Sequence, residues 1–204
     1  MLNREFILPG IASITLAVLF PIYWLSILDH SLSGFETAYR EDLLSLSWFD
    51  ALFVFIGLLE VYIYFSLRKI LRGQLNASGV NVLLLIMIGL VALFHSLVLI
   101  DVYFALQGSN AKESSKEFLV NASQFIGIGV LILYSIMGLI FSAYLLFRGI
   151  TQSVLLKVFA LLLLVGSLMQ ISLVLAVVNI LLFPIALVVL AIYFLKDPKA
   201  VDIV

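Results

Sequence analysis

The sequence contains no cysteine and few charged residues. The missing cysteine excludes disulfides, thiolate catalysis, cysteine-ligated zinc and iron–sulfur clusters. Charged residues make up 11% of the 204 residues, whereas a soluble domain carries roughly 25%. Hydrophobic residues make up 64% and the mean hydropathy is +1.26. The composition therefore predicts an integral membrane protein.

Signatures of catalytic and cofactor sites are also missing. There is no Gly-x-Ser-x-Gly, no His-Glu-x-x-His and no Walker A loop, so a hydrolase serine, a zinc protease and a nucleotide site have no support. The two histidines, His30 beyond the first predicted span and His95 inside the third, do not suit a haem. Glu60, His95 and Asp101 are separated by more than about 15 Å in depth, which argues against a metal site. We expect no metal and no cofactor.

No stretch of the chain carries a family signature that we recognise, and no basic stripe with interleaved aromatics suggests nucleic-acid binding. The expected surroundings are the lipid bilayer and, in addition, another membrane protein or further copies of this chain.

Six apolar runs are long enough to cross a hydrocarbon layer about 30 Å thick, which takes about 20 helical residues. The predicted spans are 6–28, 48–67, 80–105, 124–147, 153–178 and 180–196. Apolar residues follow one another without the alternation of a barrel strand, so the spans are helices. The predicted fold is an all-α bundle of six transmembrane helices in a single membrane domain, 1–204. The first run is longer than a signal-peptide core, so we expect it to be retained.

The gap between the last two runs is very short. Asn179 is therefore expected at or near the turn of a tight helical hairpin, although one irregular re-entrant unit is the alternative. Pro184 either starts the last helix or kinks it.

Basic residues predict the topology, because cytoplasmic loops collect lysine and arginine. With both termini cytoplasmic, 8 of the 11 basic residues fall on the cytoplasmic side. They are Arg4, Arg68, Lys69, Arg72, Arg148, Lys157, Lys196 and Lys199. The outer loops are then 29–47, where 36–47 suits a short surface helix, and 106–123, which is polar and expected to be flexible. This bias favours a plasma membrane, specifically a bacterial inner membrane.

Aromatic residues near the span ends are expected at the membrane interfaces. Tyr23 and Trp24 lie near the end of the first span, Trp48 starts the second and Tyr193 lies near the end of the sixth.

A shift of 76 residues superposes the second and third spans on the fourth and fifth. Arg72-Gly73 falls on Arg148-Gly149, and the run Ser-Leu-Val-Leu beginning at Ser96 falls on the one beginning at Ser172. The pattern suggests a duplicated helical hairpin, and chance matching of leucine-rich sequence is the alternative.

Among the residues of the predicted spans, Glu60 has the highest free-energy cost of insertion into the bilayer. A charge at the bilayer centre costs roughly 2.5–3.5 kcal/mol on insertion scales. Glu60 belongs to a stripe with helical spacing that is expected to face the bundle: Asp50, Phe53, Gly57, Glu60, Tyr64 and Arg68. Its role is either an interhelical hydrogen bond of the neutral acid or transport and signalling.

His95 and Gln170 lie at similar depths and are expected to meet across the bundle, again with a structural and a functional interpretation. In the functional one, His95 carries protons to Glu60, and Asp50 and Asp101 form the outer mouth of the path.

Small residues predict close helix contacts, within the protein or with a partner. These positions are Gly57, Gly89, Gly138 and Ser142.

Three functional classes remain open. The first is an accessory, assembly or regulatory subunit that contacts another membrane protein through its helices, and it has the largest weight because no catalytic set is found. The second is a small proton-coupled transporter or channel that uses Glu60 and His95. The third is an interfacial lipid-modifying enzyme, for which the outer acids and a histidine are the available groups: Asp29, Glu41, Asp42, Asp50, Asp101 and His30. An enzyme is therefore the less favoured class.

Overall fold

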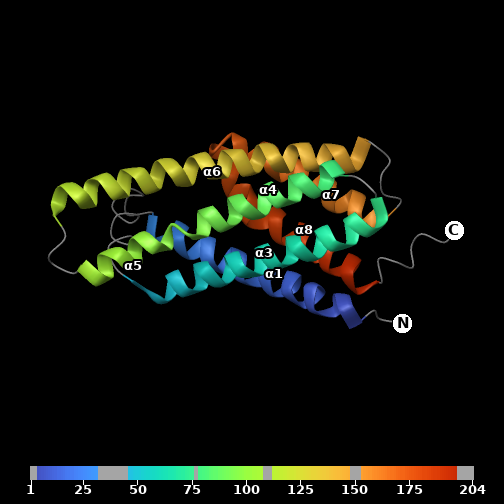
Figure 1. Ribbon diagram of the computed structural model, residues 1–204, viewed down its shortest axis with the longest axis horizontal. Helices are drawn as coiled ribbons and strands as arrows, with labels where there is room; N and C mark the ends of the chain where they lie inside the picture. Colours follow the sequence, from blue (N-terminus) through green and yellow to red (C-terminus); the bar gives the residue numbers. More distant parts are fainter. Residues whose placement is uncertain (1–3, 32–45, 76–77, 108–111, 148–152, 197–204) are drawn as a thin grey trace.

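The computed structural model describes residues 4–31, 46–75, 78–107, 112–147 and 153–196, and within these ranges every regular element is a helix (Figure 1). In chain order the elements are α1 (Arg4–Ser31), α3 (Trp48–Leu75), α4 (Ser78–His95), α5 (Val98–Gln107), α6 (Glu113–Phe147), α7 (Val154–Ile171), the 3-10 helix η2 (Val174–Val178) and α8 (Asn179–Leu195). Among the described residues, six segments are long and apolar enough to cross a membrane. The prediction of an all-α bundle with six spans is confirmed, and the chain is a multi-pass membrane protein.

The spanning helices form a closed ring in chain order. α1 packs against α3, α3 against α4, α4 against α6, α6 against α7 and α7 against α8, and α8 returns to pack extensively along α1. A ring of six helices leaves its centre to be filled by side chains from all of them. The buried core is largely aromatic and aliphatic, with Tyr64, Phe141, Phe159, Tyr193 and Phe194 among its largest fully buried side chains.

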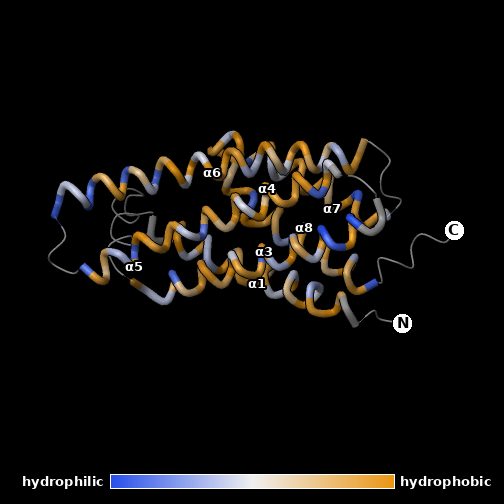
Figure 2. Tube along the Cα trace, viewed as in Figure 1, coloured by the Kyte–Doolittle hydropathy of each residue, from blue (hydrophilic) through white to orange (hydrophobic). Residues whose placement is uncertain are grey.

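Hydrophobic residues predominate along the middle of the helices, and hydrophilic residues gather toward the two ends of the long axis of the bundle (Figure 2). α1 begins and α8 ends at the same end of the bundle (Figure 1). The last turns of α3 and the first turn of α7 also lie at this end. They carry part of the basic set on which the topology prediction depends, including Arg68, Arg72 and Lys157.

Two helices extend beyond the predicted spans. α6 begins at Glu113, so residues 113–123, which were expected to be a flexible loop, are helical and α6 is about 52 Å long. An ion pair one turn apart, Lys116 Nζ to Glu113 Oε2 at 3.3 Å, supports its first turn. α3 continues through its basic residues to Leu75, with Arg68 Nε donating to Asn81 Oδ1 of α4. The span prediction missed both extensions because hydropathy reports apolar runs and not helix ends.

The third span is interrupted in the structure. α4 ends at His95, and after Ser96 and Leu97 the chain resumes as α5. Ser96 Oγ donates to the carbonyl oxygen of Leu93 (2.7 Å), and the Leu97 amide bonds to Phe94 three residues back. The shift to bonds over three residues ends the α-helix at this point.

The last two spans form a tight hairpin, as predicted, with Asn179 as the first residue of α8. The boundary differs from the predicted one, because α7 ends at Ile171 and residues 174–178 form η2. Leu173 has φ +56°, the only positive φ of a non-glycine residue in the described ranges, so this turn is strained. Ser172 Oγ accepts from the Leu175 amide (3.0 Å) and stabilises the turn. Pro184 lies inside α8 and does not start it.

The offset of 76 residues matches helix boundaries as well as sequence. Adding 76 to the bounds of α4 (78–95) yields those of α7 (154–171), and both helices end in a turn at Ser-Leu. The equivalent serines make the same hydrogen bond. Ser172 Oγ donates to the carbonyl oxygen of Met169 at 2.7 Å, and Ser96 Oγ donates to the carbonyl oxygen of Leu93 at the same distance. The matching helix bounds and serine hydrogen bonds support the duplication hypothesis more strongly than the matching leucines of the sequence do.

Candidate functional site

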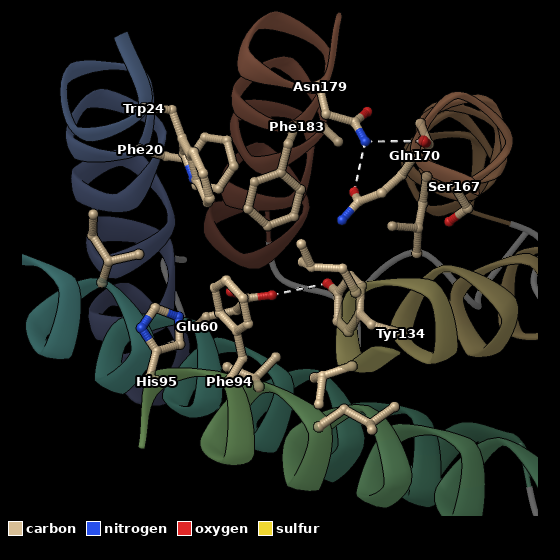
Figure 3. Close-up of a pocket in the computed structure, with 18 of the residues that line it drawn as sticks. Phe20, Trp24, Glu60, Phe94, His95, Tyr134, Ser167, Gln170, Asn179 and Phe183 are labelled. Atoms are coloured by element: carbon tan, nitrogen blue, oxygen red, sulfur yellow. Dashed lines mark hydrogen bonds between the residues drawn. The ribbon is translucent and has the colours of Figure 1, made fainter. Parts of the chain in front are cut away.

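A cavity of about 90 Å³ lies inside the ring, and all six helices of the ring contribute to its wall. By the ~30 Å³ that a water molecule occupies in the liquid, this is room for about three waters or one very small solute. Polar side chains line one part of the wall and aromatic rings line another (Figure 3).

Glu60 is the carboxylate of the polar wall. Its side chain is 7% exposed, and Oε1 accepts a hydrogen bond of 2.8 Å from the hydroxyl of Tyr134 on α6. The Tyr134 hydroxyl also bonds to the hydroxyl of Tyr64, which lies one turn after Glu60 on α3. The three side chains connect α3 with α6, which are not neighbours in the chain order of the ring.

A second polar group comes from the α7–α8 hairpin. Asn179 Nδ2 donates to Gln170 Oε1 (2.7 Å) and to the carbonyl oxygen of Gly166 (2.9 Å). Ser167, which is 4% exposed, lies beside them on the cavity wall. Asparagine at the start of α8 thus holds the hairpin closed and aligns Gln170 with the cavity (Figure 3).

The aromatic wall is a continuous series of ring contacts over four helices. Phe183 of α8 lies 4.8 Å from Phe20 of α1, measured between ring centroids, and Phe20 contacts Trp24 at 6.1 Å. Tyr23, next to Trp24, stacks on Phe53 of α3 at 5.5 Å. Tyr23 and Trp24, expected at the membrane interface, therefore face the inside of the ring, and Tyr193 is buried at 2% exposure; Trp48, 78% exposed, points outward.

His95 closes the aromatic wall at the end of α4. Its imidazole lies 4.2 Å from the ring of Phe53 and is perpendicular to Phe94 at 5.5 Å. Nδ1 is buried without a hydrogen-bond partner among the described residues. Gly57 of α3 packs directly on this imidazole, and a Cβ there would overlap it. His95 and Gln170 line the same cavity, as expected, but Gln170 bonds to Asn179 and not to His95.

The two helices related by the offset of 76 residues, α4 and α7, line the cavity with equivalent positions. Leu90, Val91 and Phe94 of α4 line it, and so do the residues 76 positions later on α7, Gly166, Ser167 and Gln170. Sites between repeats next to interrupted helices are typical of transporters. The last residue that lines the cavity is His95 in α4 and Gln170 in α7. Each of these helices is interrupted within two residues after that position.

The two outer acids do not line the cavity. Asp50 accepts a hydrogen bond from the Ser47 amide, while Ser47 Oγ accepts from the Phe49 amide (3.1 Å), which together cap the start of α3. Asp101 is 6% exposed on α5, beyond the interruption. That Asp50 and Asp101 form the outer mouth of a proton path stays a prediction.

The small residues take different roles. Gly138 of α6 lies against α7, where a Cβ would come within 2.5 Å of Ser167 Oγ, and Ser142 is fully buried. These positions, with Gly57, are close contacts inside the protein. Gly89 is not, because nothing lies within 4 Å of a Cβ built there.

Sequence reasoning missed Tyr134, which is the hydrogen-bond partner of Glu60. The available signal was a tyrosine in the middle of the apolar run Leu-Ile-Leu-Tyr-Ser-Ile, since a buried tyrosine hydroxyl requires a partner. Asp29 and His30, expected beyond the first helix, lie in the last turn of α1; Glu41 and Asp42 lie outside the described residues, as does most of the surface helix expected at 36–47.

Within the described ranges, no group of three or more histidine, aspartate or glutamate side chains is placed to hold a metal ion. No family model, curated protein or solved structure matches the chain. The function must therefore be inferred from the cavity itself.

Proposed function

We propose that this protein is a small proton-coupled transporter that binds its solute in the central cavity and uses Glu60 as the proton-carrying group. The observation that carries the proposal is the convergence of an acid, an imidazole and two amides on one cavity that all six helices line. A carboxyl group that served only to hold two helices together would need one hydrogen-bond partner and no adjoining cavity. Glu60 has a partner, Tyr134, and also borders space that holds a few waters.

The arrangement of the ring supports movement as well as binding. α4 and α7 present equivalent positions to the cavity, and both are interrupted where the lining ends. Repeats that rock against each other around a fixed site are a general way to expose that site to either side in turn.

The test is dissipation of an imposed pH gradient in liposomes that contain the purified protein, followed with an enclosed pH-sensitive dye. Because the solute is not identified, three small solutes of different charge are added outside in separate runs: tetramethylammonium, methanesulfonate and urea. We expect one of them to accelerate dissipation with the wild type and not with Glu60→Gln.

The matched control is Glu117→Gln, which makes the same change on an exposed position of α6. It should behave as the wild type. Equal dissipation by wild type and Glu60→Gln with every solute, at equal protein content, would show that the protein is not a proton-coupled transporter through this acid.

A second candidate is the accessory-subunit hypothesis, which exposed apolar side chains near the start of α6 and the end of α5 favour. Phe118 and Phe125 on α6 and Leu106 on α5 are 71%, 81% and 83% exposed, and Phe118 lies within the part of α6 that exceeds a hydrocarbon layer about 30 Å thick. Purification in mild detergent, followed by size exclusion and mass spectrometry, tests it. A stoichiometric partner that is lost in a Phe118→Ser variant would favour this function over transport.

A further inference from the structure

We propose that the solute bound in the central cavity is a small organic cation of the methylated-ammonium type, with Glu60 as its counter-ion and the aromatic wall as its binding surface. This proposal names the solute class of the transport function proposed above and rests on it.

The charges of the lining point to a cation. Glu60 is the acidic residue of the wall, and none of the described residues that line the cavity is lysine or arginine. A buried carboxylate without a basic partner is stable only when it is protonated or when a cation lies beside it. An anionic solute would meet a like charge, and a neutral solute would leave the ionised acid without compensation.

The aromatic wall provides the second element of recognition. Four helices, α1, α3, α4 and α8, contribute its rings: Phe20, Trp24, Phe53, Phe94 and Phe183. Three direct contacts among these rings are inclined by 51° to 69°, and Tyr23 links Trp24 to Phe53 with angles of 84° and 23°. Rings at such different angles offer both faces and edges as binding surfaces. The face of an aromatic ring attracts a cation, most strongly when water is excluded, and cages of this kind recognise quaternary ammonium groups.

The size of the cavity limits the cation. A cavity of about 150 Å³ holds benzene, which has six heavy atoms, so in proportion one of about 90 Å³ holds roughly four. An ammonium group carrying three methyl substituents has this number of heavy atoms, and one carrying four has a single atom more. Both groups also have few hydrogen-bond donors, which suits a wall whose amides, Gln170 and Asn179, already bond to each other.

The same geometry explains coupling to protons. The titratable side chains on or behind the wall are Tyr23, Glu60, Tyr64, His95 and Tyr134. Of these residue types, only a carboxylic acid ordinarily carries a negative charge near neutral pH, and Glu60 is the one present. When the cation enters, the carboxyl proton passes to water, and when a proton returns, the cation loses its counter-ion and leaves. One cation is thus exchanged for one proton.

The binding test uses Trp24, which lines the cavity, as a fluorescent reporter in a Trp48→Phe variant, since these are the two tryptophans of the chain. The variant in detergent micelles is titrated with tetramethylammonium and, separately, with tert-butanol, a neutral molecule of the same number of heavy atoms. We expect saturable binding of tetramethylammonium at least about tenfold tighter than that of tert-butanol. Glu60→Gln should weaken tetramethylammonium binding at least about thirtyfold, and Glu117→Gln should leave it unchanged.

A further variant covers the case in which Glu60→Gln does not fold. Phe94→Leu keeps the carboxylate and removes one ring, so it should weaken binding of tetramethylammonium about tenfold and that of tert-butanol much less. Equal affinity of the wild-type cavity for the two molecules, or binding of tetramethylammonium that is unaffected by Glu60→Gln, overturns the cation assignment.

The outcomes also separate this proposal from the transport function. If methanesulfonate or urea drives Glu60-dependent proton flux and tetramethylammonium neither binds nor drives it, the transport function stands and the cation class is wrong. If tetramethylammonium binds with the expected selectivity and no solute drives flux, the cavity is a cation site in a protein that does not transport.

Discussion

Replacing Gly57 by alanine should destabilise the protein, whereas the same change at Gly89 should not. Both glycines lie inside spanning helices, Gly57 in α3 and Gly89 in α4. A Cβ at position 57 would lie within 2.8 Å of three side-chain atoms of His95, while a Cβ at position 89 would meet nothing within 4 Å. The contact is with Cβ of His95 and with Cγ and Cδ2 of its imidazole, so rotation of a flexible end cannot relieve it.

The magnitude follows from two opposing effects. Alanine is a better helix former than glycine by about 1 kcal/mol, and this gain applies at both positions. Overpacking costs about 1–3 kcal/mol and applies only at Gly57. The expected net effect is a destabilisation of up to about 2 kcal/mol for Gly57→Ala and a stabilisation of up to about 1 kcal/mol for Gly89→Ala. For a chain of this length each kcal/mol corresponds to about 2–4 °C in the unfolding midpoint.

The assay is the thermal unfolding midpoint in one detergent, measured for the two single variants, for His95→Ala and for Gly57→Ala combined with His95→Ala. Truncation of the imidazole removes two of the three overlapping atoms, so Gly57→Ala should cost less in the His95→Ala background. If Gly57→Ala is as stable as Gly89→Ala, or if its cost is the same with and without the imidazole, the proposed packing of α3 on His95 is wrong.

Three other predictions concern separate parts of the structure. Asn179→Ala removes two hydrogen bonds across the α7–α8 hairpin and should lower stability by about 1 kcal/mol, measured as a shift of the thermal midpoint, whereas Asn121→Ala on an exposed position of α6 should have no effect. Ser47→Ala removes the cap of α3 and should also cost about 1 kcal/mol in the same assay; an unchanged midpoint would contradict the capping role. The predicted topology requires that, in intact cells, an impermeant maleimide labels Lys112→Cys and leaves Lys157→Cys unlabelled until the cells are opened, and the chain has no other cysteine to react; the reverse pattern would place the termini outside.

The sequence by itself determined the number and type of the spans, because lipid requires long apolar segments with internally bonded backbones. It also singled out Glu60, because a carboxyl group inside a membrane span costs free energy however the helices are packed. The repeated Ser-Leu-Val-Leu marks the break after His95 in the sequence, although only the tertiary structure shows that a helix ends at both copies. Helix ends such as Glu113 were missed, because polar residues continue a helix as well as apolar ones do.

The tertiary structure alone decided which polar groups meet. Tyr134 bonds to Glu60 across 74 residues of sequence, and the aromatic wall joins α1 to α8 from opposite ends of the chain. Such pairings depend on how each helix is rotated about its own axis and on where the ring closes. Both are set by the packing of side chains from distant segments, such as Gly57 on His95. Hydropathy and periodicity describe one helix at a time, so they locate a costly side chain but not the cavity that it faces.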